Sequence, residues 1–182
     1  MRAALLTSAL LLAAAPALAQ DMPAGFHAGK EITEYGPVAS IDYDLETPKN
    51  FDFKIQFDAK EGADAGALNK QLVSAARFIN MSVENGVKMK NIHLAIVVHG
   101  GATLDLLGND AYKTLKKTDA DNANAGLVAA LLDKGVRIYI CGQSAVAHGA
   151  GKEDFLPGVQ MALSAMTAHA ILSGEGYAAD MR

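Results

Sequence analysis

Two short stretches of the chain carry residues suited to chemistry, and both follow apolar runs. The first is Cys141-Gly142-Gln143-Ser144, which contains the only cysteine of the 182 residues. A thiolate is a strong nucleophile, and a helix that begins near Gln143 or Ser144 would stabilise it through free backbone N–H groups and the positive end of the helix dipole. A single cysteine after a strand is also compatible with a buried apolar filler.

The second stretch is His99-Gly100-Gly101. An imidazole at this position is suited to taking the thiol proton or orienting the thiolate, if it lies within hydrogen-bond reach of Cys141. The alternative for His99 is a strand-end histidine hydrogen-bonded to the backbone. We take Cys141 and His99 as candidate catalytic residues, and Gly100, Gly101, Gly142, Gln143 and Ser144 as candidate ligand-binding residues.

The elements that must position these stretches are visible in the hydrophobic pattern. Residues 51–58 and 136–140 alternate between apolar and polar side chains, which is typical of strands, and residues 91–98 form an apolar run that suits an interior parallel strand. Helical spacing follows Asp64, and we expect Asp64 or a neighbouring residue to cap a helix that ends at Asn85-Gly86. Helical spacing recurs over residues 121–134. Ser164 is expected to cap a last helix.

The alternation of strands and helices predicts a three-layer α/β/α fold with a mostly parallel sheet of four or five strands. Ligand sites in open parallel sheets lie beyond the carboxyl ends of the strands. We therefore expect His99-Gly100-Gly101 and Cys141-Gly142-Gln143 to meet at one edge of the sheet.

The amino-terminal residues predict export. Residues 1–19 have a charged start, an apolar run and the small-x-small sequence Ala17-Leu18-Ala19, which together are typical of a secretory signal peptide. Residues 20–50 are expected to form an extended arm, and residues 51–182 the α/β domain. No later segment is long and apolar enough to span a membrane, so we expect a periplasmic or secreted protein. One cysteine cannot form a disulfide within the chain.

Composition and motifs exclude several classes of function. The formal net charge is −4, and no basic run interleaved with aromatic residues is present, which argues against a nucleic-acid partner. The dinucleotide spacing Gly-x-Gly-x-x-Gly and the Walker loop are absent, so we expect no nucleotide cofactor. A soft metal held by His99, Cys141 and His148 is an alternative, although no metal-ligand spacing supports it, and we predict no cofactor.

Four segments together resemble the exported branch of the DsrE/DsrF-like family: residues 76–81 (ARFINM), 96–101 (IVVHGG), 135–145 (GVRIYICGQSA) and 174–177 (GEGY). The resemblance covers roughly residues 50–178. It implies a compact α/β/α domain that assembles as a trimer or hexamer. Cytoplasmic relatives include sulfur-relay subunits, in which a cysteine carries a persulfide between donor and acceptor proteins.

Carried over to this chain, the resemblance implies that Cys141 accepts sulfur, with Gly142, Gln143 and Ser144 supplying hydrogen-bond donors beside it. The first hypothesis is thus a thiol-based sulfur carrier or sulfurtransferase-like protein, with a sulfur donor or acceptor protein as partner. Two alternatives remain: a small-ligand or metal-binding module without turnover, and a structural oligomer with an inert thiol.

Overall fold

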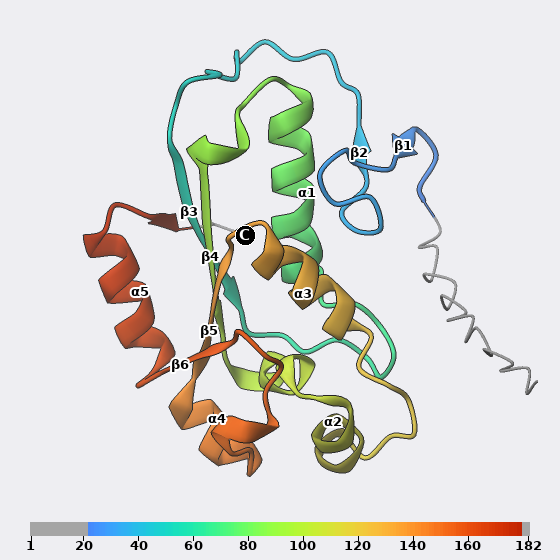
Figure 1. The fold of residues 1–182 in the computed structure, drawn as a ribbon, viewed down its shortest axis with the longest axis vertical. Coiled ribbons are helices and arrows are strands. Elements are labelled where there is room, and N and C mark those ends of the chain that lie inside the picture. The colour runs from blue at the N-terminus through green and yellow to red at the C-terminus, as the bar shows by residue number, and fades with distance from the viewer. Residues whose placement is uncertain (1–21, 180–182) are drawn as a thin grey trace, which may run out of the picture.

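The computed structural model describes residues 22–179, which are built around a five-stranded parallel sheet (Figure 1). The strands are β3 (Phe53–Ala59), β4 (Ile92–Val98), β5 (Arg137–Cys141), β6 (Gln160–Ala162) and β7 (Ala178–Ala179). Their order in the sheet is β6-β5-β4-β3-β7, and every neighbouring pair is parallel. The predicted α/β/α class and the number of strands are confirmed. β7 was not among the expected strands, because a two-residue strand has no measurable alternation.

Helices cover both faces of this sheet. α1 (Lys70–Glu84) and α3 (Asn124–Asp133) lie on one face and α5 (Ala165–Gly174) lies on the other (Figure 1). At the carboxyl ends of the strands the chain forms shorter helices: α2 (Asn109–Lys116), α4 (Gly142–His148) and the 3-10 helices η2 (Gly100–Leu106) and η3 (Lys152–Asp154). A further 3-10 helix, η1 (Met89–Asn91), precedes β4 at the opposite edge.

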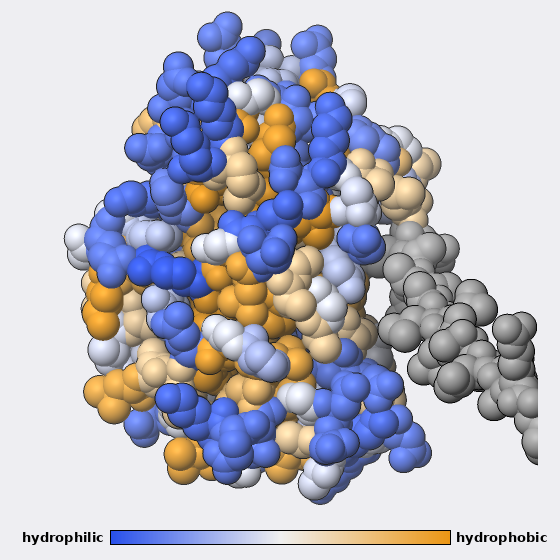
Figure 2. All heavy atoms as spheres, in the orientation of Figure 1, coloured by the Kyte–Doolittle hydropathy of each residue, from blue (hydrophilic) through white to orange (hydrophobic). Residues whose placement is uncertain are grey.

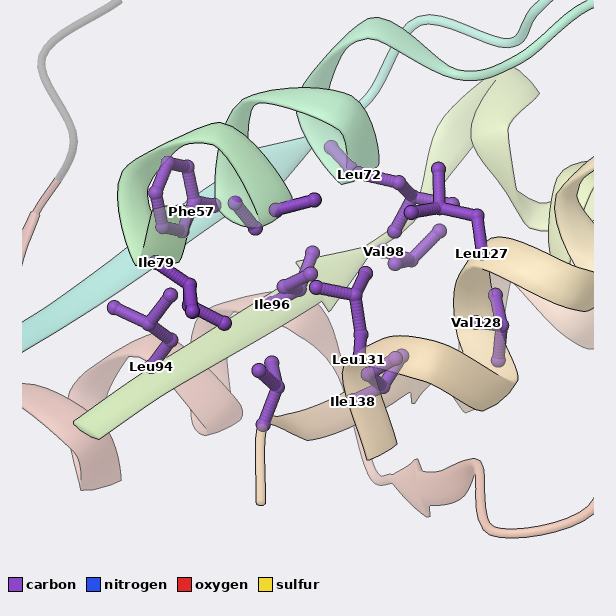
Figure 3. Packing of buried hydrophobic residues seen from close by; sticks show 14 of the residues in the cluster. Phe57, Leu72, Ile79, Leu94, Ile96, Val98, Leu127, Val128, Leu131 and Ile138 are labelled. Atoms are coloured by element: carbon purple, nitrogen blue, oxygen red, sulfur yellow. The ribbon is translucent and has the colours of Figure 1, made fainter. Parts of the chain in front are cut away.

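The main core lies between the sheet and the pair α1 and α3. Apolar side chains of β3, β4 and β5 point at those of the two helices, and Figure 3 shows them meeting in one continuous layer. A smaller core lies under α5, where Ala95 and Val97 of β4 pack against Ala168 and Leu172. Residues of β4 with odd numbers therefore face α5, as alternation in a strand requires. This parity decides which strand-end side chains share the α5 face.

Helix starts follow side-chain capping, with one difference from the sequence prediction. The N-cap of α1 is Asn69, whose side chain accepts hydrogen bonds from the N–H groups of Gln71 and Leu72. Asp64 itself, the residue named among the expected caps, is not the N-cap. Asn69 is buried and is held by Asp105 and Asn124, contacts from distant segments that a local pattern does not contain. The predicted cap of α5 by Ser164 is confirmed, since its hydroxyl accepts from the N–H of Thr167.

The amino-terminal part of the described chain lies along α1 and contains two short strands, β1 (Phe26–His27) and β2 (Val38–Ala39). The buried amide of Asn80 on α1 fixes it. This amide accepts from the N–H groups of Glu31 and Ile32 and donates to the carbonyls of Ile32, Tyr35 and Gly36. The predicted signal peptide lies outside the described residues. Within residues 22–179, no helix has the length and apolar character needed to cross a membrane.

Candidate functional site

Cys141 lies where β5 ends and α4 begins. It is the last residue of β5, pairs with Ala162 of β6, and is the N-cap residue of α4. Its side chain belongs to the α5 face, because Ile138 and Ile140 point into the main core on the other side. The residue is only 6% exposed. The sequence prediction that the cysteine stands at a strand end with a helix beginning directly after it is therefore confirmed.

The surroundings of the thiol favour its ionised form. Burial alone would raise the pKa of Cys141, but hydrogen bonds to the sulfur outweigh burial and the pKa lies below its ordinary value of 9.0. The donors are the backbone N–H groups of Ser144, Ala165 and Gln143 and the hydroxyl of Ser144. Because Ala165 is the first residue of α5, the sulfur receives N–H groups from the starts of two helices. This convergence stabilises a thiolate in a nearly buried position.

Ser144 joins the two strand-end stretches that the sequence singled out. Its Oγ accepts a hydrogen bond from the N–H of Gly100 at 3.0 Å and donates to the sulfur of Cys141. Gly100 has a φ of +55°, and a Cβ there would lie 3.0 Å from the carbonyl oxygen of Lys60. A residue with a side chain would strain this turn and move the N–H that orients Ser144. The predicted meeting of the two stretches at one edge is confirmed through this contact.

The remaining candidate ligand-binding residues have packing roles in this structure. A Cβ at Gly142 would lie 2.9 Å from the carbonyl oxygen of Ala162, so glycine permits the close approach of β6. A Cβ at Gly101 would lie 3.2 Å from the backbone nitrogen of Gly62. The side chain of Gln143 is exposed and donates to the carbonyl of Leu163 at 3.3 Å. Ligand contacts by these residues remain predictions.

His99 follows β4 at the same edge, but its ring is engaged by β3. Nε2 lies 2.9 Å from Oδ1 of Asp58, and no hydrogen bond joins the imidazole to Cys141 in the described part of the chain. The same Asp58 oxygen lies 3.0 Å from Nε2 of His169 on α5, a residue that the sequence analysis did not single out. The odd-even parity of the strands was the available signal: Gln56 and Asp58 share the face that Cys141 and His99 use.

The metal alternative has no support in the described geometry. His148 donates from Nε2 to the carbonyl of Gly100 at 2.9 Å and so braces the turn. Among residues 22–179, no group of three or more His, Cys, Asp or Glu side chains is arranged to hold a metal ion. His99, Cys141 and His148 therefore do not form a ligand set here.

An apolar groove lies beside β6, the strand that pairs with the end of β5. A groove of about 350 Å³ lies between β6 and α5 and is lined by Tyr139, Met161 and Leu163, among others. Met166 on α5 is 81% exposed and Leu163 is 72% exposed. Hydrophobic residues are also visible in Figure 2 along the edge where α5 lies in Figure 1. We call Met161, Leu163, Met166 and Ile171 the α5–β6 apolar surface.

Comparisons with known proteins found one family and similar solved structures. The model of the DsrE/DsrF-like family matches residues 53–179. A protein of unknown function from Methanobacterium thermoautotrophicum, MTH1491, superposes with a TM-score of 0.53 at 19% identity, covering 71% of this chain and 98% of that one. The ychN protein from E. coli gives a TM-score of 0.47 at 14% identity, covering 70% and 96%. No curated protein matches the sequence.

Proposed function

The chain belongs to the DsrE/DsrF-like family, a family associated with sulfur-relay proteins, and we propose that it is a thiol-based sulfur carrier that acts through Cys141. One observation carries the proposal: a nearly buried sulfur accepts hydrogen bonds from the starts of α4 and α5 and from the Ser144 hydroxyl. An inert structural thiol in an apolar site has a raised pKa, whereas the pKa of Cys141 is lowered.

The lowered pKa suits both halves of a carrier cycle. In loading, the Cys141 thiolate attacks the terminal sulfur of a persulfide donor R–S–SH, the donor S–S bond breaks, and R–S⁻ leaves with the electron pair. In release, an acceptor thiolate attacks the outer sulfur of Cys141–S–SH, and Cys141 leaves as a thiolate. A thiol of lower pKa is a better leaving group, so the four donors favour release.

Intact mass spectrometry tests the carrier role. The full chain is incubated with polysulfide, the excess is removed, and the mass is compared with that of Cys141→Ser treated in parallel. We expect one added sulfur atom on the wild type, which a thiol acceptor such as glutathione then removes, and no addition to the variant. A wild-type protein without an adduct, or an equal adduct on the variant, would refute the carrier role.

The α5–β6 apolar surface supports a second proposal, that copies of this chain associate through it. Proteins of the family often form oligomers, and burying several large apolar side chains is favourable by about 25 cal/mol per Å². Light scattering on the wild type should give a trimer or hexamer, and Met166→Glu with Ile171→Glu should give smaller species. Met22→Glu, at another exposed methionine, is the matched control. A monomeric wild type at micromolar concentration would contradict this assembly.

Export is likewise proposed, from residues 1–19 alone. Fractionation of cells that express the full chain should recover a shortened protein outside the cytoplasm. A full-length cytoplasmic protein would contradict the prediction. The sulfur donor and acceptor would then be sought in the compartment where the protein is found.

A further inference from the structure

A hydrogen-bonded series of four side chains runs along the α5 face of the sheet, beside the edge that carries the thiol. The proposed sulfur transfer by Cys141 alone does not use this series. This series passes from Gln56 on β3 to His169 on α5, returns to Asp58 on β3, and ends at His99 after β4. The separations are 2.8 Å from Gln56 Oε1 to His169 Nδ1, 3.0 Å from His169 Nε2 to Asp58 Oδ1, and 2.9 Å from Asp58 Oδ1 to His99 Nε2.

Gln56, at the other end of this series, determines which ring nitrogen of His169 donates to it. Gln56 is 2% exposed, and its Nε2 donates to the carbonyl of Tyr177 at 3.2 Å and to Oγ of Ser173 at 2.9 Å. A carbonyl oxygen only accepts, so the amide orientation is determined and Oε1 faces His169. Nδ1 of His169 must therefore carry a proton. Its Nε2 faces a carboxylate oxygen of Asp58 at 3.0 Å.

His99 is the member of this series that lies nearest to Cys141. Asp58 Oδ1 accepts a hydrogen bond from Nε2–H of His99, and this contact selects the tautomer of the ring. Nδ1 of a neutral His99 is then a proton acceptor, and it has no hydrogen-bond partner among residues 22–179. The His99 side chain is 24% exposed, so a bound molecule can reach it. His169 differs, because both of its ring nitrogens are occupied.

His99, at one end of this hydrogen-bonded series, lies next to the Cys141 thiol. Val98 and Ile140 are register partners in the neighbouring strands β4 and β5, so His99 and Cys141 each follow that pair by one residue. Parity puts both on the α5 face. The N–H of Gly100, directly after His99, is bonded to the same Ser144 hydroxyl that donates to the Cys141 sulfur.

We propose that His99 is the acid–base group of sulfur transfer, acting through Nδ1, and that Asp58, His169 and Gln56 are positioning residues that hold it in that role. This inference rests on the proposed carrier function. It assigns His99 a different task from deprotonating Cys141, because the starts of two helices and Ser144 already favour the thiolate.

The Cys141 thiolate forms a bond to the terminal sulfur of R–S–SH, and the donor S–S bond breaks with its electron pair on R–S⁻. The His99 imidazolium gives its Nδ1 proton to R–S⁻, which leaves as R–SH, and His99 returns to the neutral Nε2–H tautomer. Asp58 stabilises the imidazolium by accepting from Nε2–H throughout, as the carboxylate does in a Ser-His-Asp triad.

Asp58→Asn tests the assignment, with Asp133→Asn on the exposed end of α3 as the matched control. The rate of sulfur transfer from glutathione persulfide to the full chain is followed by mass spectrometry. Long-range proton–nitrogen NMR correlation reports which ring nitrogen of His99 is protonated. We expect Asp58→Asn to slow transfer by about tenfold or more, the scale of general acid–base catalysis, and to remove the Nε2–H tautomer preference. Asp133→Asn should leave both unchanged.

His169→Asn provides the second variant, because it interrupts the hydrogen-bonded series while the His99 and Asp58 side chains stay unchanged. A merely structural role would lower stability and leave the His99 tautomer as it is, whereas a positioning role alters the tautomer signal and slows transfer together. Transfer by Asp58→Asn within about twofold of the wild-type rate, with an unchanged His99 tautomer, would overturn the assignment. If the wild type accepts no sulfur at all, the carrier function fails, and the NMR signal still decides whether Asp58 fixes the His99 ring.

Discussion

The backbone N–H of Ala165 donates a hydrogen bond to the sulfur of Cys141. Ala165 is the first residue of α5, so this contact ties the last helix to the carboxyl end of β5 across the edge strand β6. The thiol thus lies between two helix starts instead of one. Its own helix, α4, has only seven residues, and the contribution from α5 is an independent source of N–H groups.

Ala165→Pro should raise the pKa of Cys141 without disrupting α5. Proline removes the donating N–H, yet it is favoured at the first position of a helix. The preceding Ser164 is extended, at φ −156° and ψ 164°, which is compatible with a following proline. Titration of the thiolate by ultraviolet absorbance measures the effect, and circular dichroism checks the fold.

Lys70→Pro is the matched control for that experiment. Lys70 is the first residue of α1, which covers the opposite face of the sheet, and the preceding Asn69 is also extended. This variant should leave the Cys141 titration where it is in the wild type. If the two proline variants titrate alike, the Ala165 N–H does not act on the sulfur.

Ser144→Ala should also raise the pKa of Cys141, because it removes the hydroxyl donor while the N–H of residue 144 remains. In the wild type, the lowered pKa extends the thiolate to lower pH, below the ordinary value of 9.0. In Ser144→Ala the thiolate should be lost at a higher pH, and alkylation by iodoacetamide at neutral pH should slow accordingly. Ser74→Ala, on α1, is the control, and equal titration of the two variants would contradict the role given to Ser144.

The same lowered pKa predicts the direction of a stability change with pH. A thiol whose pKa is lower in the folded state stabilises that state fully above its ordinary pKa of 9.0, which applies in the unfolded chain, and loses this contribution as the pH falls through the folded pKa. The free energy of unfolding of the wild type, relative to Cys141→Ser, should therefore rise between neutral pH and about pH 9. Urea unfolding at several pH values measures it, and a difference that falls with pH would contradict the thiolate.

Part of this site could be predicted from the sequence, and the part that could not has a physical explanation. The meeting of Cys141 with His99 and Gly100 follows from strand parity and from the rule that parallel strands end at a common edge. The role of Ala165 could not be predicted, because the contact of its N–H with Cys141 depends on where α5 starts relative to the end of β5. His169 was missed for the same reason, since helical spacing alone does not say which strand residues a helix covers.

Gly100→Ala should destabilise the protein and weaken the thiolate, whereas Gly135→Ala should only destabilise it. Both glycines have positive φ, +55° and +78°, which costs an alanine about 1–2 kcal/mol. The added Cβ has open space at Gly135 but lies 3.0 Å from the carbonyl oxygen of Lys60 at Gly100. Unfolding in urea together with thiolate titration separates the two effects. Equal titration in the two variants would show that the Gly100 turn does not orient Ser144.

Asn80→Ala should release the amino-terminal segment from α1 and lower the free energy of unfolding by about 2–4 kcal/mol, because it leaves several backbone groups of residues 31–36 without partners. Asn80 is fully buried, so the orphaned groups have little access to water. Asn85→Ala, which removes an exposed amide bonded to Tyr43, is the control and should cost under about 1 kcal/mol. Hydrogen exchange should show faster exchange over residues 28–36 in Asn80→Ala alone. This segment lies along α1, which covers the face of the sheet away from Cys141. Sulfur loading of the folded variant should therefore stay at the wild-type level, and a loss of loading would mean that the segment supports the thiol edge.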